Sequence, residues 1–319
     1  KAAVLAIVIE ALLRVARRSL KSRTAFAIAG VSFLALYLFR VPFPLVILAA
    51  GLFGYLGTRV SPGLLGSGTV PAPDETGASP DRSLSAALKT ILLWGGLWAA
   101  AFVLAFAAFG PSSLYAALAA FFSKMAVVTF GGAYAVLAYV AQAAVETFGW
   151  LRPGEMIDGL ALAETTPGPL ILVLTFVGFQ AAYRDPGGLS PLMGGLFGAV
   201  LTTWVTFIPC FLWIFLGAPY IEKLRQNRAL SGALAAIGAA VVGVILNLSQ
   251  WFALQTLFSR VGDFKAGPVR MALPEWGSLD PLALALAMLS AVLLLKAHLG
   301  MAKVLAIAAM LGIAAKTLL

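Results

Sequence analysis

The chain has 319 residues, of which 61% are hydrophobic and 11% are charged, and its formal net charge is +9. Soluble domains carry about 25% charged residues, so this composition excludes a water-soluble protein and predicts a surface that mostly faces lipid. A basic chain can indicate a nucleic-acid partner, but Lys and Arg also collect on the cytoplasmic loops of membrane proteins. We therefore expect membrane lipid as a partner and no nucleic acid.

The residue types needed for metal or triad chemistry are scarce. Cys210 is the only cysteine and His298 the only histidine, which argues against a disulfide within the chain, a cysteine-rich metal site or a catalytic triad. We expect no metal, no cofactor, no catalytic residue and no enzymatic activity.

Long apolar blocks predict transmembrane helices, because one crossing needs about 20 apolar residues. The blocks without Asp, Glu, Lys or Arg are Thr24–Phe39, Val41–Thr58, Thr90–Ser123, Met125–Val145, Thr165–Tyr183, Pro186–Ile221 and Ala229–Ser259. The longest of them exceed a single crossing and must turn, tilt or break. The fold class that follows is an all-α, polytopic integral membrane protein.

Residues 1–60 form a short N-terminal module. The chain starts at Lys1 rather than Met, and its apolar start is short for a span, so we expect the remainder of a helix from a longer protein. Two crossings, Thr24–Phe39 and Val41–Thr58, follow a basic cluster that the positive-inside rule places in the cytoplasm. That cluster is Arg14, Arg17, Arg18, Lys21 and Arg23.

Residues 61–85 are rich in Gly, Pro and Ser, which predicts a flexible polar linker. Residues 86–319 then form a long C-terminal module. Its first crossing, Leu84–Phe109, ends at a predicted turn over residues 110–113.

Two breaks are predicted inside the C-terminal module. As one helix rising 1.5 Å per residue, Ser113–Trp150 would far exceed the hydrocarbon core of about 30 Å. The weak point is Phe130-Gly131-Gly132, because paired glycines are poor helix formers. The next segment is interrupted by Thr165-Thr166-Pro167-Gly168-Pro169, since proline disrupts a helix interior.

The second basic cluster, Lys223, Arg225 and Arg228, bears on how these pieces cross the membrane. If each of the preceding segments crossed fully, the cluster would lie outside, against the charge rule. Partial, re-entrant crossings at the two breaks return it to the cytoplasm. We therefore predict broken, re-entrant helices.

The end of the chain repeats the order of its beginning. A long segment, Ser231–Ser259, is followed by a polar loop over Arg260–Asp280 and then by a pair, Pro281–Leu295 and Val304–Ala315. The charge assignments give the two copies opposite directions, which is the pattern of an inverted repeat in transporters.

Five short motifs, in this order and spacing, resemble the chromate transporter family over residues 121–257. They are Phe130-Gly131-Gly132-Ala133-Tyr134, Trp150-Leu151, Asp158-Gly159-Leu160-Ala161-Leu162, Thr166-Pro167-Gly168-Pro169 and Phe176-Val177-Gly178-Phe179. Residues 1–60 resemble the end of the family's N-terminal half, whose own motifs this chain lacks, and residues 86–319 resemble its C-terminal half. The family often has Gln before the Thr-Pro-Gly-Pro run, whereas this chain has Glu164 and Thr165 there.

The resemblance implies a multi-pass transporter that exports or exchanges an oxyanion, chromate or sulfate, across a prokaryotic inner membrane. It also allows proton coupling and a homodimer or a partner half-transporter. Three alternatives stay open: a transporter of another anion or a small organic acid, an intramembrane enzyme, and a structural membrane subunit.

The candidate substrate-binding residues lie at or near the two breaks, where the start of a half-helix would expose N–H groups to an anion. They are Lys124, Phe130, Gly131, Gly132, Thr165, Thr166, Pro167 and Gly168. Lys124 would supply a countercharge, or it is a lysine that snorkels near a helix end. The glycine pair, like Gly194–Gly198, could instead serve close helix packing.

Glu164 and Asp158 are the candidates for proton coupling. A buried carboxylate has a raised pKa and can carry a proton. The alternative for Glu164 is a favourable charge at a helix N-terminus. The alternative for Asp158 is a solvated helix face shared with Glu155 near Trp150.

Overall fold

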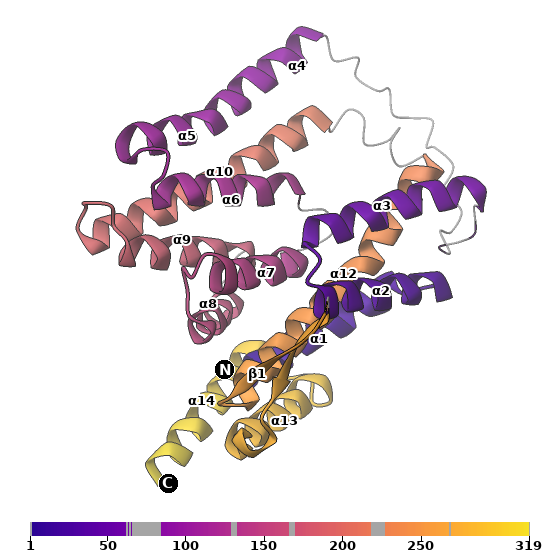
Figure 1. Ribbon diagram of the computed structural model, residues 1–319, viewed down its shortest axis with the longest axis vertical. Helices are drawn as coiled ribbons and strands as arrows, with labels where there is room; N and C mark the ends of the chain where they lie inside the picture. The colour runs from indigo at the N-terminus through magenta and orange to yellow at the C-terminus, as the bar shows by residue number, and fades with distance from the viewer. Residues whose placement is uncertain are drawn as a thin grey trace.

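The computed structural model describes residues 2–61, 63, 65, 84–128, 133–165, 170–217, 227–267 and 269–318. Within these ranges four helices are long and apolar enough to cross a membrane: Phe43–Val60, Leu84–Phe109, Pro191–Gly217 and Arg228–Leu257. Several shorter apolar helices accompany them (Figure 1). The prediction of a largely helical, polytopic membrane protein is confirmed.

The N-terminal module consists of α1 (Ala2–Ser19), α2 (Arg23–Phe39) and α3 (Phe43–Val60). The Ser22 hydroxyl caps α2 by accepting the Ala25 N–H at 3.1 Å. Arg40 ends α2 in the left-handed region, with φ 49°, and the prolines at the start of α3 suit a first helical turn. The chain thus reverses between α2 and α3, as Figure 1 shows, and their free ends lie on the same face.

The central helix α12 (Arg228–Leu257) packs against α1, α2 and α3. Glycines make this contact close. A Cβ added to Gly232 would lie 2.8 Å from the Gly54 carbonyl oxygen, and one added to Gly243 would lie 2.3 Å from the Ala29 carbonyl oxygen. Small residues allow helix backbones to approach in this way in membranes.

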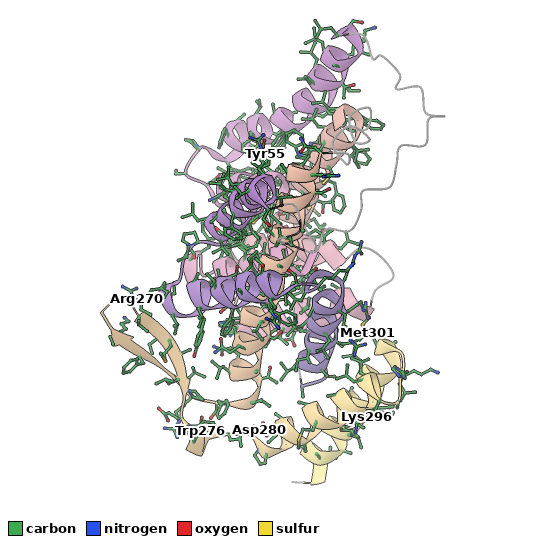
Figure 2. The ribbon with its side chains drawn as sticks, turned by 90° about the vertical axis from the view of Figure 1, so that its right-hand side faces the viewer. Tyr55, Arg270, Trp276, Asp280, Lys296 and Met301 are labelled. Atoms are coloured by element: carbon green, nitrogen blue, oxygen red, sulfur yellow. The ribbon has the colours of Figure 1, made fainter. Side chains whose placement is uncertain are left out.

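A β-hairpin follows α12, where the sequence predicted only a polar loop. Strands β1 (Val261–Ala266) and β2 (Val269–Pro274) pair antiparallel, around a turn in which Gly267 has φ +60°. This small hairpin is an addition to a fold whose all-α class is confirmed. Figure 2 shows it projecting from the helices, with Arg270 near its tip and Trp276 and Asp280 near its base.

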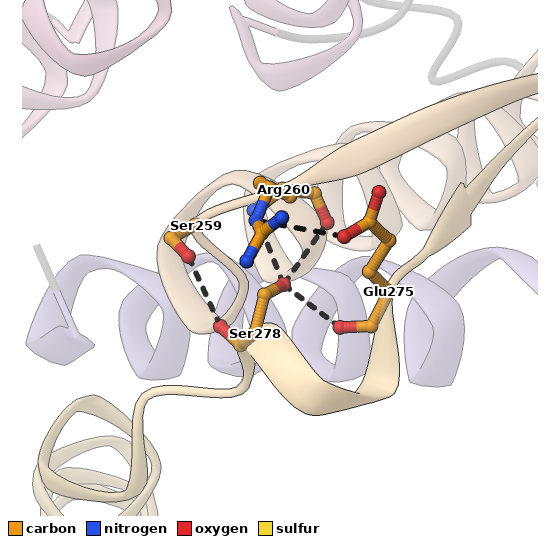
Figure 3. A network of polar contacts seen from close by, with 4 residues as sticks. All are labelled: Ser259, Arg260, Glu275 and Ser278. Atoms are coloured by element: carbon orange, nitrogen blue, oxygen red, sulfur yellow. Dashed lines mark hydrogen bonds and ion pairs between the residues drawn. The ribbon is translucent and has the colours of Figure 1, made fainter.

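A polar network closes the base of this hairpin (Figure 3). The Ser278 hydroxyl, in the 3-10 turn η5 (Trp276–Ser278), accepts the Arg260 N–H at 3.1 Å and donates to the Glu275 carbonyl at 2.7 Å. The Arg260 Nε lies 3.5 Å from the Glu275 carboxylate. These contacts join the two strand ends and lead the chain into α13 (Pro281–Leu295) and then α14 (Met301–Leu318).

The two ends of the chain pack reciprocally. Helix α12 packs on α2 and α3, while α1 packs on α13 and α14, and α1 and α12 contact each other. A two-fold relation between α1–α3 and α12–α14 would exchange these pairs, so this packing is what the predicted inverted repeat requires.

The remaining described elements form the middle of the chain (Figure 1). They are α4 (Leu84–Thr90), the π-turn η1 (Ile91–Gly95), α5 (Gly96–Phe109), α6 (Leu114–Val128), α7 (Ala133–Gln142), the π-turn η2 (Ala143–Thr147), α8 (Pro153–Thr165), η3 (Leu170–Leu172), α9 (Val173–Arg184) and α10 (Pro191–Gly217).

Candidate functional site

Three turns of the middle region meet on one face of the protein. The Tyr115 hydroxyl, at the start of α6, donates to the Pro186 carbonyl at 3.0 Å. The Arg184 guanidinium, at the end of α9, donates to the Trp150 carbonyl at 2.9 Å. Residues 110–113, 148–152 and 185–190 are therefore neighbours, and we call their common surface the turn face.

Both helix pairs between these turns begin and end at the turn face. Helix α6 leaves the turn face, and the chain is back at that face at the end of η2. Helix α8 leaves it and α9 returns to it, since Glu155 in the first turn of α8 forms an ion pair with Arg184 at the end of α9. With 15 residues, α6 is only about 22 Å long, which is too short for a core of about 30 Å. This agrees with the predicted partial crossings.

Aromatic rings hold the first hairpin closed at the turn face. Phe148 stacks on Trp150 with ring centroids 4.2 Å apart, and Phe121 of α6 lies edge-on to Trp150 at 5.6 Å. This cluster ties the end of η2 to α6, and Trp150 is buried.

The helix ends inside the protein flank both predicted breaks. Helix α6 ends at Val128 and α7 begins at Ala133, while α8 ends at Thr165 and η3 begins at Leu170. Helix α7 also contacts η3, so the inner ends of the two hairpins are adjacent. Six candidate residues lie outside the described residues: Phe130, Gly131, Gly132, Thr166, Pro167 and Gly168.

Helix starts and helix ends meet at these inner ends. Helix α7 begins there and η3 leads into α9 there, while α6 and α8 end there. A helix start carries about half a positive charge and presents free N–H groups, and a helix end carries the opposite partial charge. The two helix starts therefore offer N–H donors to an anion at the inner ends, but the partial charges of the four helix termini oppose one another.

The remaining candidates occupy different positions. Lys124 is exposed on α6, in a stripe with Ala120 and Val127, and has no hydrogen bond or ion pair with another described residue. Glu164 and Thr165 belong to the last turn of α8 by their backbone, but their side chains lie outside the described part of the chain.

Asp158 is exposed on α8, one turn after Glu155. Burial alone would raise the pKa of Glu155, but the Arg152 N–H and the Arg184 guanidinium together outweigh it and lower this pKa. Glu155 is thus a partner of Arg184 beside Trp150, the residue near which this helix face was expected to lie.

The glycines of α9 and α10 serve close packing, which was one of the two predicted readings for Gly194–Gly198. A Cβ on Gly198 would lie 2.5 Å from the Gly178 carbonyl oxygen, and one on Gly178 would lie 2.1 Å from the Thr202 hydroxyl oxygen. Gly178, within the Phe176–Phe179 motif, therefore holds the second hairpin against the long helix α10.

Arg40, at the C-terminal end of α2, forms an arginine centre that the sequence did not predict. Arg40 Nη1 lies 3.7 Å from the Glu146 carboxylate on η2, and Nη2 lies 3.7 Å from the Asp263 carboxylate on β1. The guanidinium joins three elements that are far apart in the chain. The only local signal was the charge between two apolar spans, because both partners come from distant segments.

Cations cluster on the face opposite the turn face, and ion pairs occur on both faces, since Arg14 of α1 pairs with Glu10. On the side of the turn face, Arg40, Arg184 and Arg260 each pair with a carboxylate. On the opposite side, the cations near the start of α2 and the α13–α14 turn form no ion pair within the described residues. We call this side the basic face; its cations include Arg17, Arg18, Arg23, Lys296 and Lys303.

Comparison with known proteins agrees with the motifs. The chain is 37% identical to the chromate transport protein of Pseudomonas aeruginosa over 122 residues, which are 38% of this chain and 26% of that protein. It is 30% identical to the chromate transport protein of Cupriavidus metallidurans over 132 residues, 41% of this chain and 30% of that one. The chain thus spans about a third or less of the length of these relatives, and no solved structure matches it.

A model of the family described as chromate transporter matches residues 116–313. This match contains both helical hairpins, α10, α12 and most of the C-terminal pair. Since it covers more than half of the 319 residues, the chain belongs to the chromate transporter family and is a multi-pass membrane protein.

Proposed function

We propose that this protein moves a tetrahedral oxyanion, chromate or sulfate, across a prokaryotic inner membrane, with the basic face in the cytoplasm. One observation supports the proposal: two helical hairpins begin and end at the turn face and have adjacent inner ends, with α7 and the η3–α9 segment both beginning there. Transporters commonly bind substrate where discontinuous helices meet. The sidedness follows from the unpaired cations of the basic face.

The binding chemistry follows from the residues around the inner ends. Glycine at 131 and 132 lets an anion approach the backbone closely, and the hydroxyls of Thr165 and Thr166 add donors. Lys124, which is exposed on α6 one turn before its inner end, would supply the full positive charge that balances a dianion. This set recognises the charge and the oxygens of an oxyanion but does not distinguish chromate from sulfate.

We assign the coupling of anion transport to protons to the carboxylates of α8. Glu164 lies in the last turn of this helix, beside the substrate region, and a carboxylate there can take up a proton that moves with the anion. Asp158, two turns nearer the turn face, would exchange that proton with water. Exchange of one anion for another is the competing mode and needs no change in protonation.

The assembly is part of the proposal. Residues 1–60 would be the end of one transporter half, residues 61–85 a linker and residues 86–319 the second half. The reciprocal packing of α1 and α12 supports two related halves. A second copy of this chain in a homodimer, or a separate half-transporter, would supply the rest of the transporter.

Flux into liposomes tests the function. The full-length protein, reconstituted in liposomes, should take up radiolabelled chromate or sulfate faster than empty vesicles, and a panel with other anions and small organic acids ranks the substrates. Lys124→Ala should lose uptake, while Lys303→Ala on the basic face should keep it. No uptake of any oxyanion, or uptake of an organic acid alone, would overturn the proposal.

A further inference from the structure

We propose that a cavity between α1 and α13, on the basic face, binds the phosphate headgroup of an anionic phospholipid. The cavity has a volume of about 550 Å³. Its rim carries Arg14, Arg17, Arg18 and His298 together with one carboxylate, Glu10, and its wall carries Leu294 and Leu295. This site is separate from the hairpin region, and the inference does not depend on which substrate is transported.

The rim has more positive charge than the protein itself neutralises. Arg14 forms an ion pair with Glu10, one turn earlier on α1. Arg17 and Arg18 are exposed and pair with no acidic side chain among the described residues. Two guanidinium groups therefore remain for an external anion, and planar guanidinium groups suit phosphate oxygens.

The wall of the cavity distinguishes a lipid from a free anion. Leu295 continues along α13 as an apolar stripe through Val292, 50% exposed, and Met288, 57% exposed. These residues are spaced by three and four positions, so they share one face of the helix. A headgroup held at the rim would lay its acyl chain along this stripe, whereas free phosphate would leave the stripe uncovered.

The cavity also lies at the depth where headgroups are found. It sits at the end of α13, beside the turn into α14 that Figure 2 marks with Lys296 and Met301. Basic pockets between transmembrane helices on the cytoplasmic side are typical sites for anionic headgroups. Its volume is within the range of about 300–1,000 Å³ that small ligands occupy.

Native mass spectrometry of the full chain can test this. The protein, purified in a neutral detergent, is titrated with phosphatidylglycerol and with phosphatidylcholine. We expect phosphatidylglycerol to bind more tightly, and Arg17→Gln/Arg18→Gln to weaken that binding about 10- to 30-fold. Lys89→Gln/Lys303→Gln removes two charges outside the cavity and should leave the binding unchanged.

A charge-conserving variant and a competition experiment with inorganic phosphate complete the test. Arg17→Lys/Arg18→Lys keeps the charge and should retain most of the binding, which separates charge from folding if the glutamine variant is unstable. Inorganic phosphate, added at millimolar concentration, should not displace phosphatidylglycerol. Equal binding of the two lipids, equal loss in the control variant, or displacement by inorganic phosphate would each overturn the proposal.

Discussion

The contact between α9 and α10 gives the sharpest test of how the second hairpin is held. In Gly178→Ala, the new Cβ would lie 2.1 Å from the Thr202 hydroxyl oxygen and 2.7 Å from the Gly198 carbonyl oxygen. Thr202 is buried, and a backbone carbonyl cannot swing away as the end of a side chain can. The two helices must therefore separate along their contact.

The expected change in the free energy of unfolding of Gly178→Ala is the balance of two effects. Extra volume in a tightly packed region costs about 1–3 kcal/mol, and a clash with backbone belongs at the upper end. Alanine recovers about 1 kcal/mol over glycine in a helix interior. The free energy of unfolding should thus fall by about 1–2 kcal/mol. Gly96→Ala, where no atom lies within 4 Å of the new Cβ, should be neutral or stabilising.

Thermal unfolding of the full-length protein in detergent measures the difference in stability between Gly178→Ala and Gly96→Ala. Liposome flux measures how that difference affects transport. Thr202→Ala removes the hydroxyl, which has no hydrogen-bond partner in the described structure. Combined with Gly178→Ala, it should restore part of the stability, because the Gly198 carbonyl still blocks the new Cβ. If Gly178→Ala unfolds at the same temperature as Gly96→Ala, the packing argument is wrong.

Three further variants address charge. The lowered pKa of Glu155 means that its pairing with Arg184 stabilises the protein fully above its ordinary pKa of 4.5 and is lost as the pH falls through the lower folded pKa. Glu155→Gln should therefore flatten the acid limb of a stability–pH curve, and an unchanged limb would contradict this. Glu164→Gln should weaken the pH dependence of flux while the protein stays in the membrane; an unchanged dependence removes Glu164 from coupling. Arg40→Gln breaks contacts at 3.7 Å to partly exposed carboxylates, so its thermal stability should fall by at most about 1 kcal/mol, and a larger fall would show that Arg40 is a main support of the fold.

Composition and local chemistry were enough to predict the membrane class, while the two predicted breaks lie largely outside the described residues. Paired glycines and a Pro-Gly-Pro run weaken a helix wherever they occur, and the described helices end beside both. The hairpins begin and end at the turn face, and this depends on contacts such as that of the Tyr115 hydroxyl with the Pro186 carbonyl. Such contacts join residues far apart in the chain, and only the charge rule gave an indirect hint of them.

The β-hairpin and the Arg40 centre escaped prediction for related reasons. Strand β1 reads Val-Gly-Asp-Phe-Lys-Ala and is exposed along most of its length, so it has no buried apolar face that would mark it as a strand. The hairpin is held instead by the Ser278 network at its base. Arg40 gains its role only when η2 and β1 are brought to it, so no local pattern marks it.

The packing divides the protein into two parts, the helices of the two chain ends (α1–α3 and α12–α14) and the middle region (α4–α10). The contacts within each part differ in kind from the contacts between the parts. Helices α2 and α3 are joined to α12 by backbone contacts at glycines, and so are α9 and α10 to each other. Between the two parts, the first hairpin meets α2, α3 and the β-hairpin through the Arg40 ion pairs and the stacking of Phe43 on Tyr139 at 5.6 Å, and α7 also packs on α12 within one continuous apolar core. Exposed ion pairs are worth less than about 1 kcal/mol, whereas separating packed helices forfeits many close contacts. Relative movement of the two parts would therefore break the Arg40 ion pairs at little cost, and its main cost would come from the contact of α7 with α12.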